Sequence, residues 1–229
     1  MAAMIETVII PVLNRYDLLE RAVRSLGTVD TLIVIDNGGK LSDDDVRAWS
    51  ANGAIQNVGR VYVWPMPSNL GVATSWNLGI KATAHANGWL LLNSDAWFTD
   101  GAYEAFSADT EGAEVVQAGV PPWCCTWISA EAIGRVGLFC ERFYPAYMED
   151  VDWQARAINR GIEFRSSGAH VQHENSSTIN SSEHYLQGNK RTHRANNAIF
   201  RDRWEGVSED GVPVDAEWDL KIRLANSWA

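Results

Sequence analysis

The chain has 229 residues, and 46% of them are hydrophobic, which suits one α/β domain with a sizeable core. Its 19 basic and 29 acidic side chains give a net charge of −10, so the average surface repels polyanions and nucleic acid is not an expected partner. No window approaches the roughly 20 consecutive apolar residues of a membrane span, and the start lacks the pattern of a secretion signal, so we expect a cytoplasmic protein without a membrane span.

The first part of the chain alternates predicted strands with predicted helices. Four short apolar runs, most of them rich in β-branched residues, predict buried strands at residues 7–12, 31–35, 61–64 and 89–92. Helical patterns lie between them, at residues 15–26, 43–49 and 72–85. Asn14 is expected to cap the first helix. The alternation predicts a mostly parallel, Rossmann-like α/β sheet flanked by helices.

Beyond residue 100 the pattern is less regular. It predicts a strand, a short helix, a longer helix and an edge strand, at residues 115–118, 129–136, 150–160 and 163–165. The polar segment 174–187 predicts a mobile loop, and the basic segment 190–204 predicts a helix. We expect one domain over residues 1–178, with residues 179–229 forming a loop and a helical extension packed on it.

Polar residues follow three of the predicted strands. Asn14 comes after the first strand, Asp36 after the second and Asp95 after the fourth. The carboxyl ends of parallel strands meet at one edge of a sheet, where α/β proteins bind their ligands. Asp36 is suited to hydrogen-bond a ribose or a base edge, and Pro11 and Asn14 would shape the first loop around a nucleobase.

Asp95 is the candidate metal ligand. A hard divalent cation prefers carboxylate oxygen, and the end of a rigid strand fixes that oxygen well. His173 could complete the site, since Mn²⁺ accepts imidazole. The alternatives without function are a helix cap for Asp95 and a surface position for His173.

A second acidic cluster, Glu149, Asp150 and Asp152, stands at the start of the predicted helix 150–160. The helix dipole favours the ionised form of these carboxyls, and repulsion between them opposes it. Asp150 is the candidate general base, which would take the proton of an attacking hydroxyl. A helix cap with acidic neighbours is the alternative that needs no function.

Transfer of a sugar from a nucleoside diphosphate builds negative charge on the leaving diphosphate. A divalent metal ion can neutralise that charge, and a carboxylate near the acceptor can remove the proton of the hydroxyl. Lys190, Arg191 and Arg194 on the C-terminal helix could close over the diphosphate, or form a solvated helix face. The aromatic segment 121–127 is expected near the sugar and acceptor pocket.

An ordered set of motifs over residues 5–177 resembles the inverting glycosyltransferase family 2, which has the GT-A nucleotide-sugar fold and includes small soluble bacterial and phage members. The matching stretches are VIIPVLNR at 8–15, VIDNG at 34–38, NLG at 69–71 with Asn77, LNSD at 92–95, YMEDVD at 147–152 with Arg156 and Gly161, and His173 with Ser177. Beyond them, FRDRW at 200–204 resembles the aromatic and basic close of related bacterial enzymes.

The resemblance implies transfer of a monosaccharide from a UDP- or dTDP-sugar to a hydroxyl of a saccharide or a protein, with Mn²⁺ or Mg²⁺ as cofactor. It implies Asp95 as a metal ligand, His173 as a metal or phosphate ligand, and Asp150 with Glu149 as the catalytic pair. The sequence departs from the family's metal motif at Asn93, where the first aspartate would stand, and leaves Asp95 as the main anchor. The candidate residues for binding the nucleotide sugar are Pro11, Asn14, Asp36, Asn69, Asn77 and Asn93, with Lys190 and Arg191 of the predicted basic helix.

Other classes of protein share parts of this pattern. A dinucleotide-dependent oxidoreductase needs a glycine-rich turn after the first strand, and residues 11–16 contain no glycine. A nucleotidyltransferase would carry a glycine-rich basic loop at the same place. A nucleotide-sugar-binding protein or a non-catalytic carbohydrate-binding module would have no use for Asp150, so replacement of Asp150 separates these classes from a transferase.

Overall fold

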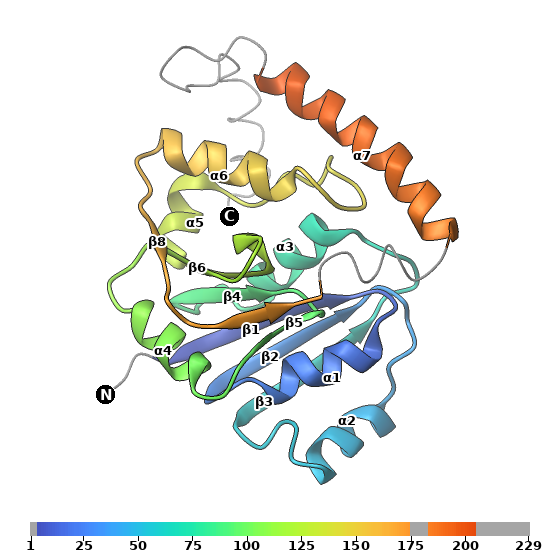
Figure 1. The fold of residues 1–229 in the computed structure, drawn as a ribbon, viewed down its shortest axis with the longest axis vertical. Helices are drawn as coiled ribbons and strands as arrows, with labels where there is room; N and C mark the ends of the chain where they lie inside the picture. The colour runs from blue at the N-terminus through green and yellow to red at the C-terminus, as the bar shows by residue number, and fades with distance from the viewer. Residues whose placement is uncertain (1–3, 175–182, 205–229) are drawn as a thin grey trace.

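A seven-stranded sheet forms the centre of the molecule (Figure 1). The structure is a computed structural model, and it describes residues 4–174 and 183–204. The strands lie in the order β3-β2-β1-β4-β7-β6-β8. In that order their bounds are Val58–Pro65, Val29–Asp36, Ile5–Val12, Gly88–Leu92, Cys125–Ser129, Val115–Ala118 and Phe164–Ser166. The first four strands run parallel, β7 is antiparallel to both neighbours, and β6 and β8 are parallel, so the predicted mostly parallel sheet is confirmed.

A second, two-stranded sheet lies beside the carboxyl end of β4. It consists of β5 (Ala96–Phe98) and β9 (Val171–His173), which pair antiparallel with Ala96 opposite His173. β5 begins just after the turn that ends β4, in which the Ala96 amide donates to the Asn93 carbonyl at 3.1 Å. This small sheet therefore brings a late segment of the chain to the end of β4.

Helices cover both faces of the large sheet (Figure 1). One face carries α1 (Tyr16–Arg24), α2 (Asp43–Ala51) and α4 (Ala102–Asp109). The other face carries α3 (Val72–Ala82), α5 (Ala130–Val136) and α6 (Glu149–Asn159). α7 (Glu183–Trp204), orange in Figure 1, lies outside this second layer and is joined to α6 by side-chain contacts.

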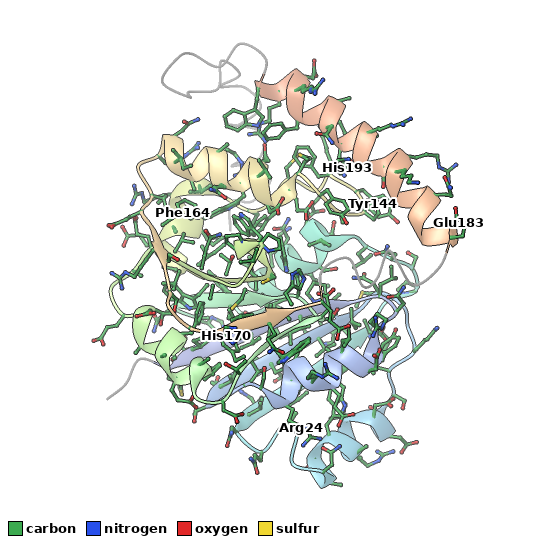
Figure 2. All side chains as sticks on the ribbon, viewed as in Figure 1. Arg24, Tyr144, Phe164, His170, Glu183 and His193 are labelled. Atoms are coloured by element: carbon green, nitrogen blue, oxygen red, sulfur yellow. The ribbon has the colours of Figure 1, made fainter. Side chains whose placement is uncertain are left out.

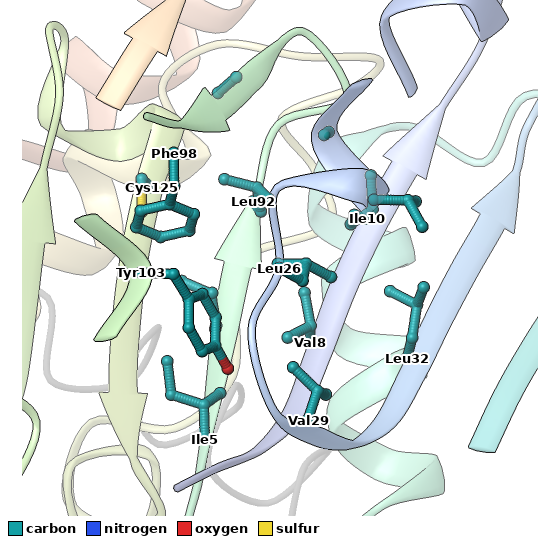
Figure 3. Close-up of a cluster of buried hydrophobic side chains, with 14 of the residues drawn as sticks. Ile5, Val8, Ile10, Leu26, Val29, Leu32, Leu92, Phe98, Tyr103 and Cys125 are labelled. Atoms are coloured by element: carbon teal, nitrogen blue, oxygen red, sulfur yellow. The ribbon is translucent and has the colours of Figure 1, made fainter. Parts of the chain in front are cut away.

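Successive residues of β1 point into opposite cores. Val8 and Ile10 belong to the cluster that includes α1 and the aromatic side chains of β5 and α4 (Figure 3), whereas Ile9 belongs to the cluster under α3. A central parallel strand is buried on both faces, so its sequence is a continuous apolar run. At Gly79 of α3 an added Cβ would lie 2.7 Å from the Ile9 side chain, so a glycine here lets α3 pack directly on β1.

A buried ionic network joins α6, α5 and α7. The fully buried Asp152 carboxylate accepts from Arg156 Nε at 3.1 Å and from Trp204 Nε1 at 3.2 Å. It also forms an ion pair with Arg203, whose Nη1 lies 2.6 Å from Asp152 Oδ1. Arg156 also donates to two backbone carbonyls at and just after the end of α5, at 2.8 Å each. Both oxygens of the carboxylate have partners, and these contacts offset the desolvation cost of a buried charge.

Most predicted elements are present, with ends shifted by a few residues. The strand at 115–118 is β6, and the predicted edge strand is β8 at the end of the sheet. The prediction missed α4 and three strands, β5, β7 and β9. β5 and β9 have three residues each, too few to show a periodicity, and β7 is buried on both faces and so lacks alternation.

Two predictions at element ends are wrong. Asn14 does not cap α1, which begins at Tyr16 with Arg15 at the N-cap position. Residues 183–187, expected in a loop, form the first turns of α7. The rest of that loop, residues 175–182, and residues 205–229 of the predicted extension lie outside the described residues. The domain boundary at residue 178 stays a prediction.

The buried network predicts a large loss of stability for Asp152→Asn. The variant leaves two arginines without a carboxylate, and we expect a loss of about 3–5 kcal/mol in the free energy of unfolding. The matched control is Asp44→Asn, which breaks the exposed Asp44–Arg47 pair of α2 and should cost about 1 kcal/mol or less. Urea unfolding measures both, and equal losses would contradict the role assigned to Asp152.

Candidate active site

A cavity of about 390 Å³ opens at the carboxyl ends of β1 and β4. Its wall also includes the start of α3, the loop before α6, the first turn of α6, and parts of β9 and α7. Three carboxylates, those of Asp95, Glu149 and Asp150, lie in this wall. Within residues 4–174 and 183–204, no lysine or arginine lines the cavity. An anionic ligand therefore needs a cation that the described wall does not supply.

The structure brings together residues that are far apart in the sequence. The residues singled out from the sequence that line the cavity are Pro11, Asn69, Asn93, Asp95, Glu149, Asp150 and His173. The aromatic segment expected near the pocket also contributes, through Pro121, Trp123 and Cys124. Those singled out that do not line it are Asn14, Asp36, Asn77, Lys190 and Arg191.

Asp95 and His173 face each other across the small sheet. His173 Nε2 lies 3.1 Å from Asp95 Oδ1, and His173 Nδ1 lies 3.2 Å from the Val120 carbonyl oxygen. A carbonyl can only accept, so Nδ1 carries a proton, and in the neutral imidazole Nε2 presents a lone pair to the carboxylate. Two acceptors at this distance need a cation between them, either a proton on Nε2 or a metal ion.

The protonation of His173 reflects this arrangement. Burial lowers the pKa of His173, but the hydrogen bond and the negative charge of Asp95 outweigh burial, and the pKa is raised above its ordinary value. The raised pKa favours a proton on Nε2, in the position between the two side chains that a metal ion could take.

Glu149 is the most deeply buried acid of the cavity wall. It is 4% exposed, and its Oε2 atom has no hydrogen-bond partner among the described residues. Burial, and to a smaller extent the charge of Asp150, raise the pKa of Glu149 well above its ordinary value. A carboxyl in this position holds its proton to higher pH than an ordinary glutamic acid.

Asp150 differs from its neighbour. Its carboxylate accepts a hydrogen bond from the Val151 amide at 2.8 Å, and burial is the largest cause of a raised pKa of Asp150. An aspartate with a raised pKa takes up a proton more readily than an ordinary one, as a general base must. The two adjacent carboxyls thus have different surroundings, one enclosed and one partly hydrogen-bonded by backbone.

Asp36 lies behind the cavity wall, and the expectation that it faces a nucleoside is corrected by its contacts. The side chain is fully buried. Its carboxylate accepts from Tyr16 Oη at 2.6 Å and from the amides of Gly39 at 3.0 Å and Leu41 at 2.7 Å. These bonds hold the turn between β2 and α2, and they use both oxygens of the carboxylate.

The next residue, Asn37, takes the place on the wall that was expected of Asp36. Its Nδ2 donates to Ser75 Oγ at 2.9 Å, and its Oδ1 accepts from the Leu70 amide at 2.9 Å. Asn37 therefore joins the end of β2 to the start of α3. The polar run after β2 pointed to this region, but the residue that faces the cavity depends on the path of the turn.

Asn77 is also structural. It is 1% exposed, its Oδ1 accepts from the Phe139 amide at 2.9 Å, and its Nδ2 donates to the Phe139 carbonyl and to Glu141 Oε1. It ties α3 to the segment after α5, and it does not reach the cavity. Its predicted place beside the nucleotide is therefore corrected.

The predicted basic closure over the cavity is not found. Lys190 and Arg191 are exposed on α7, whereas Gly188 and Thr192 of the same helix line the cavity. Gly188 and Thr192 are four residues apart and so share one side of α7, whereas Lys190 is two residues from each of them and Arg191 is next to Thr192, and these spacings point away from that side. Asn14, in the loop after β1, is partly buried and does not line the cavity either.

The sequence analysis missed the loop before α6. Tyr144, Pro145, Ala146 and Tyr147 all line the cavity. Tyr147 belongs to the recognised motif at 147–152, but no periodicity shows that it and the three residues before it fold over the same cavity. Trp76 on α3 was missed as well, because a tryptophan at helical spacing is typical of a core.

Residues 7–124 match the model described as Glycosyl transferase family 2, which is more than half of the sequence. The chain therefore belongs to this family. The match includes β1, β2 and β4 with Asp95, and it ends before α6 and β9. No curated protein matches the sequence.

Several solved structures of glycosyltransferases are similar to this one. GalNAc-T7 with UDP, GalNAc and Mn²⁺ has a TM-score of 0.59 at 12% identity, and the match covers 74% of this chain and 43% of that chain. PcManGT, a mannosyltransferase from Pyrobaculum calidifontis in complex with GDP-Man and Mn²⁺, has a TM-score of 0.53 at 14% identity, covering 72% and 54%. Glucosyl-3-phosphoglycerate synthase from Mycobacterium tuberculosis, with Mn²⁺, UDP and glucosyl-3-phosphoglycerate, has a TM-score of 0.58 at 18% identity, covering 86% and 79%.

The likeness at these identities concerns the fold, and it confirms the predicted GT-A architecture. The chain spans about half the length, or less, of the first two of these proteins. Among the described helices, none is long and apolar enough to cross a membrane.

The burial of Glu149 predicts that Glu149→Gln changes the free energy of unfolding by an amount that depends on pH. In the unfolded chain this acid ionises near its ordinary value of 4.5, but the folded protein holds the proton to higher pH. Rising pH above that value therefore favours the unfolded state. Relative to wild type, the neutral glutamine variant should gain up to about 1.4 kcal/mol in unfolding free energy per pH unit.

Urea unfolding of both proteins from about pH 4 to about pH 8, without metal or nucleotide, checks this expectation. The difference between the two proteins isolates the contribution of residue 149, because all other titrating groups are shared. A constant difference over the whole range would contradict a buried, neutral Glu149.

Proposed function

We propose that the cavity is the active site of an inverting glycosyltransferase, which moves a monosaccharide from a UDP- or dTDP-sugar to an acceptor hydroxyl. The observation that carries the proposal is the pairing, within one cavity of a family 2 chain, of Asp95 facing His173 with the adjacent carboxyls of Glu149 and Asp150. Asp95 and His173 are suited to hold a metal ion at the diphosphate, and Glu149 with Asp150 is suited to supply a base at the acceptor.

The donor set of Asp95 and His173 fits a divalent metal. Adjacent ligands of an octahedral ion bound at about 2.1 Å lie roughly 3 Å apart, close to the 3.1 Å between His173 Nε2 and Asp95 Oδ1. The bond from Nδ1 to the Val120 carbonyl leaves Nε2 as the ligand atom and orients the ring. When bound, such an ion would neutralise charge on the leaving diphosphate.

The protein alone supplies few ligands for that ion. Within the described residues no group of three or more His, Cys, Asp or Glu side chains could surround a metal. The oxygens of the donor diphosphate would complete the coordination, so metal and nucleotide sugar should bind together. The three similar structures named above contain Mn²⁺ with UDP or GDP-Man, which supports this choice of metal and donor class.

The chemistry assigned to the second pair is proton removal. Asp150 would accept the proton of the acceptor hydroxyl as its oxygen attacks the anomeric carbon, opposite to the bond that breaks to the diphosphate. Attack from that side inverts the configuration of this carbon. The enclosed Glu149 would remain neutral, so it adds no charge to repel the diphosphate.

Donor binding is expected to depend on metal. A thermal-shift panel of UDP, UDP-glucose, UDP-N-acetylglucosamine, dTDP-glucose and GDP-mannose should show a higher Tm for at least one uridine or deoxythymidine nucleotide sugar with Mn²⁺ than with EDTA. A ligand at about 100 times its Kd stabilises the folded state by about 2.7 kcal/mol. Asp95→Asn should abolish the effect of Mn²⁺, whereas Asp44→Asn should keep it. No shift with any nucleotide sugar would sink the proposed function.

The base role predicts a selective loss in Asp150→Asn. We expect nucleoside diphosphate release from the bound donor, with water as acceptor when none is added, to fall at least about 100-fold in kcat. Nucleotide binding by thermal shift should persist. Asp44→Asn, at the second position of α2 as Asp150 is of α6, is the matched control. Unchanged turnover in Asp150→Asn would remove Asp150 from the base role, and absence of turnover in wild type would favour a binding protein.

A further inference from the structure

The backbone before the catalytic pair follows an unusual path. Tyr147 and Met148 both have φ of 76°, and they are the only residues other than glycine with positive φ in the described parts of the chain. Side chains with a Cβ avoid this left-handed region, so two such residues in a row need support from their surroundings. Met148 is the N-cap residue of α6 and has no side-chain cap of its own.

Support comes from one residue of α7. Asn196 Nδ2 donates to the Ala146 carbonyl at 2.8 Å and to the Tyr147 carbonyl at 3.1 Å. These carbonyls belong to the peptide units on either side of Tyr147, so one amide group holds both units that set its left-handed conformation. Asn196 is 2% exposed, which protects both bonds from competition by water.

The other side of the loop is held by α3. The Val72 amide donates to the Pro145 carbonyl at 2.8 Å, and Tyr144 Oη donates to the Asn69 carbonyl at 3.1 Å. The Tyr147 ring meets the His193 ring of α7 edge-on, with centroids 5.3 Å apart. Figure 2 labels Tyr144 on the loop and His193 on α7. The loop is thus held from both sides immediately before α6 begins.

The direction of the first turn of α6 depends on that loop. The Met148 carbonyl accepts from the Asp152 amide at 2.9 Å, so Met148 starts the helical hydrogen bonding of α6. Glu149 and Asp150 follow directly and line the cavity. A change of φ at Tyr147 or Met148 would rotate both carboxyls relative to Asp95 and His173.

We propose that Asn196 is a positioning residue for Glu149 and Asp150: its amide fixes the left-handed turn that aims both carboxyls into the cavity. This inference rests on the proposed function, in which Asp150 is the base. Asn196 itself does not line the cavity, so its effect is transmitted through the backbone.

The test compares Asn196→Ala and Asn196→Asp with Asn197→Ala and Asn197→Asp. Asn197 is the neighbouring residue on α7, and its Nδ2 donates to the His193 carbonyl of its own helix at 2.9 Å. Both substitutions remove the donors of Asn196, and the aspartate also places an acceptor against two carbonyls. The same changes at Asn197 remove no hydrogen bond to the loop, and they can reach it only through the His193 ring, whose Nδ1 lies 3.1 Å from Asn197 Nδ2 and which packs on Tyr147.

The first readout is amide hydrogen exchange by mass spectrometry, which needs no substrate. Residues 149–152 should exchange at least about 10-fold faster in the Asn196 variants, with the central strands unchanged. The second readout is turnover of the nucleotide sugar that gives the largest thermal shift. We expect kcat to fall on the order of 100-fold, because a displacement of about 1 Å is enough for that loss, while KM for the nucleotide sugar changes less than about 3-fold.

Two exchange results in the Asn196 variants would overturn the inference: exchange at residues 149–152 equal to that of wild type, or exchange raised uniformly over the whole protein. Equal effects of the Asn196 and Asn197 substitutions would overturn it as well. So would a rise in KM without a fall in kcat in the Asn196 variants. The proposed function fails separately. If Asp150→Asn is active, the base role is lost, but the exchange result still decides whether Asn196 fixes the turn. If Asp150→Asn is inactive and the Asn196 variants are normal, only the inference on Asn196 fails.

Discussion

The buried Asp152 carboxylate is the interaction on which one half of the cavity depends. It lies three residues after Glu149 and two after Asp150, and its partners come from α6 itself and from the end of α7. An isolated charge in the interior would be strongly unfavourable, so the two arginines are a requirement of the fold rather than an addition to it. Their geometry fixes where α7 crosses α6, and that crossing places Asn196 against the loop before the helix.

The other half of the cavity depends on the sheet. β4 ends at Leu92, the tight turn that begins at Asn93 leads into β5, and β9 pairs with β5 so that His173 lies beside Asp95. In the first half burial raises the pKa values of Glu149 and Asp150, and in the second half Asp95 raises the pKa of His173. A reaction that separates charge as it proceeds needs both kinds of titratable group within one cavity.

The sequence predicted well what periodicity and chain order encode. Apolar runs located β1 to β4, and a carboxylate at the end of β4 is recognisable because a polar residue stops an apolar run there. The sequence could not predict which residue of the polar turn after β2 lines the cavity, because the hydrogen bonds of that turn decide whether it is Asp36 or Asn37. Nor could it predict the wall formed by Tyr144 and Tyr147, because Tyr144 bonds to Asn69 far earlier in the chain and the Tyr147 carbonyl bonds to Asn196 about fifty positions later.

That distance along the chain has a consequence for synthesis on the ribosome. The strands and helices up to α6 can form as they emerge, since β1 to β4 pair with one another in parallel and need nothing from the C-terminal helix. Asp152 acquires Arg203 and Trp204 only when translation has passed residue 204. Nascent chains shorter than this would hold Asp152 with Arg156 as its only cationic partner inside a nearly finished domain, so the side of the cavity formed by α6 matures last.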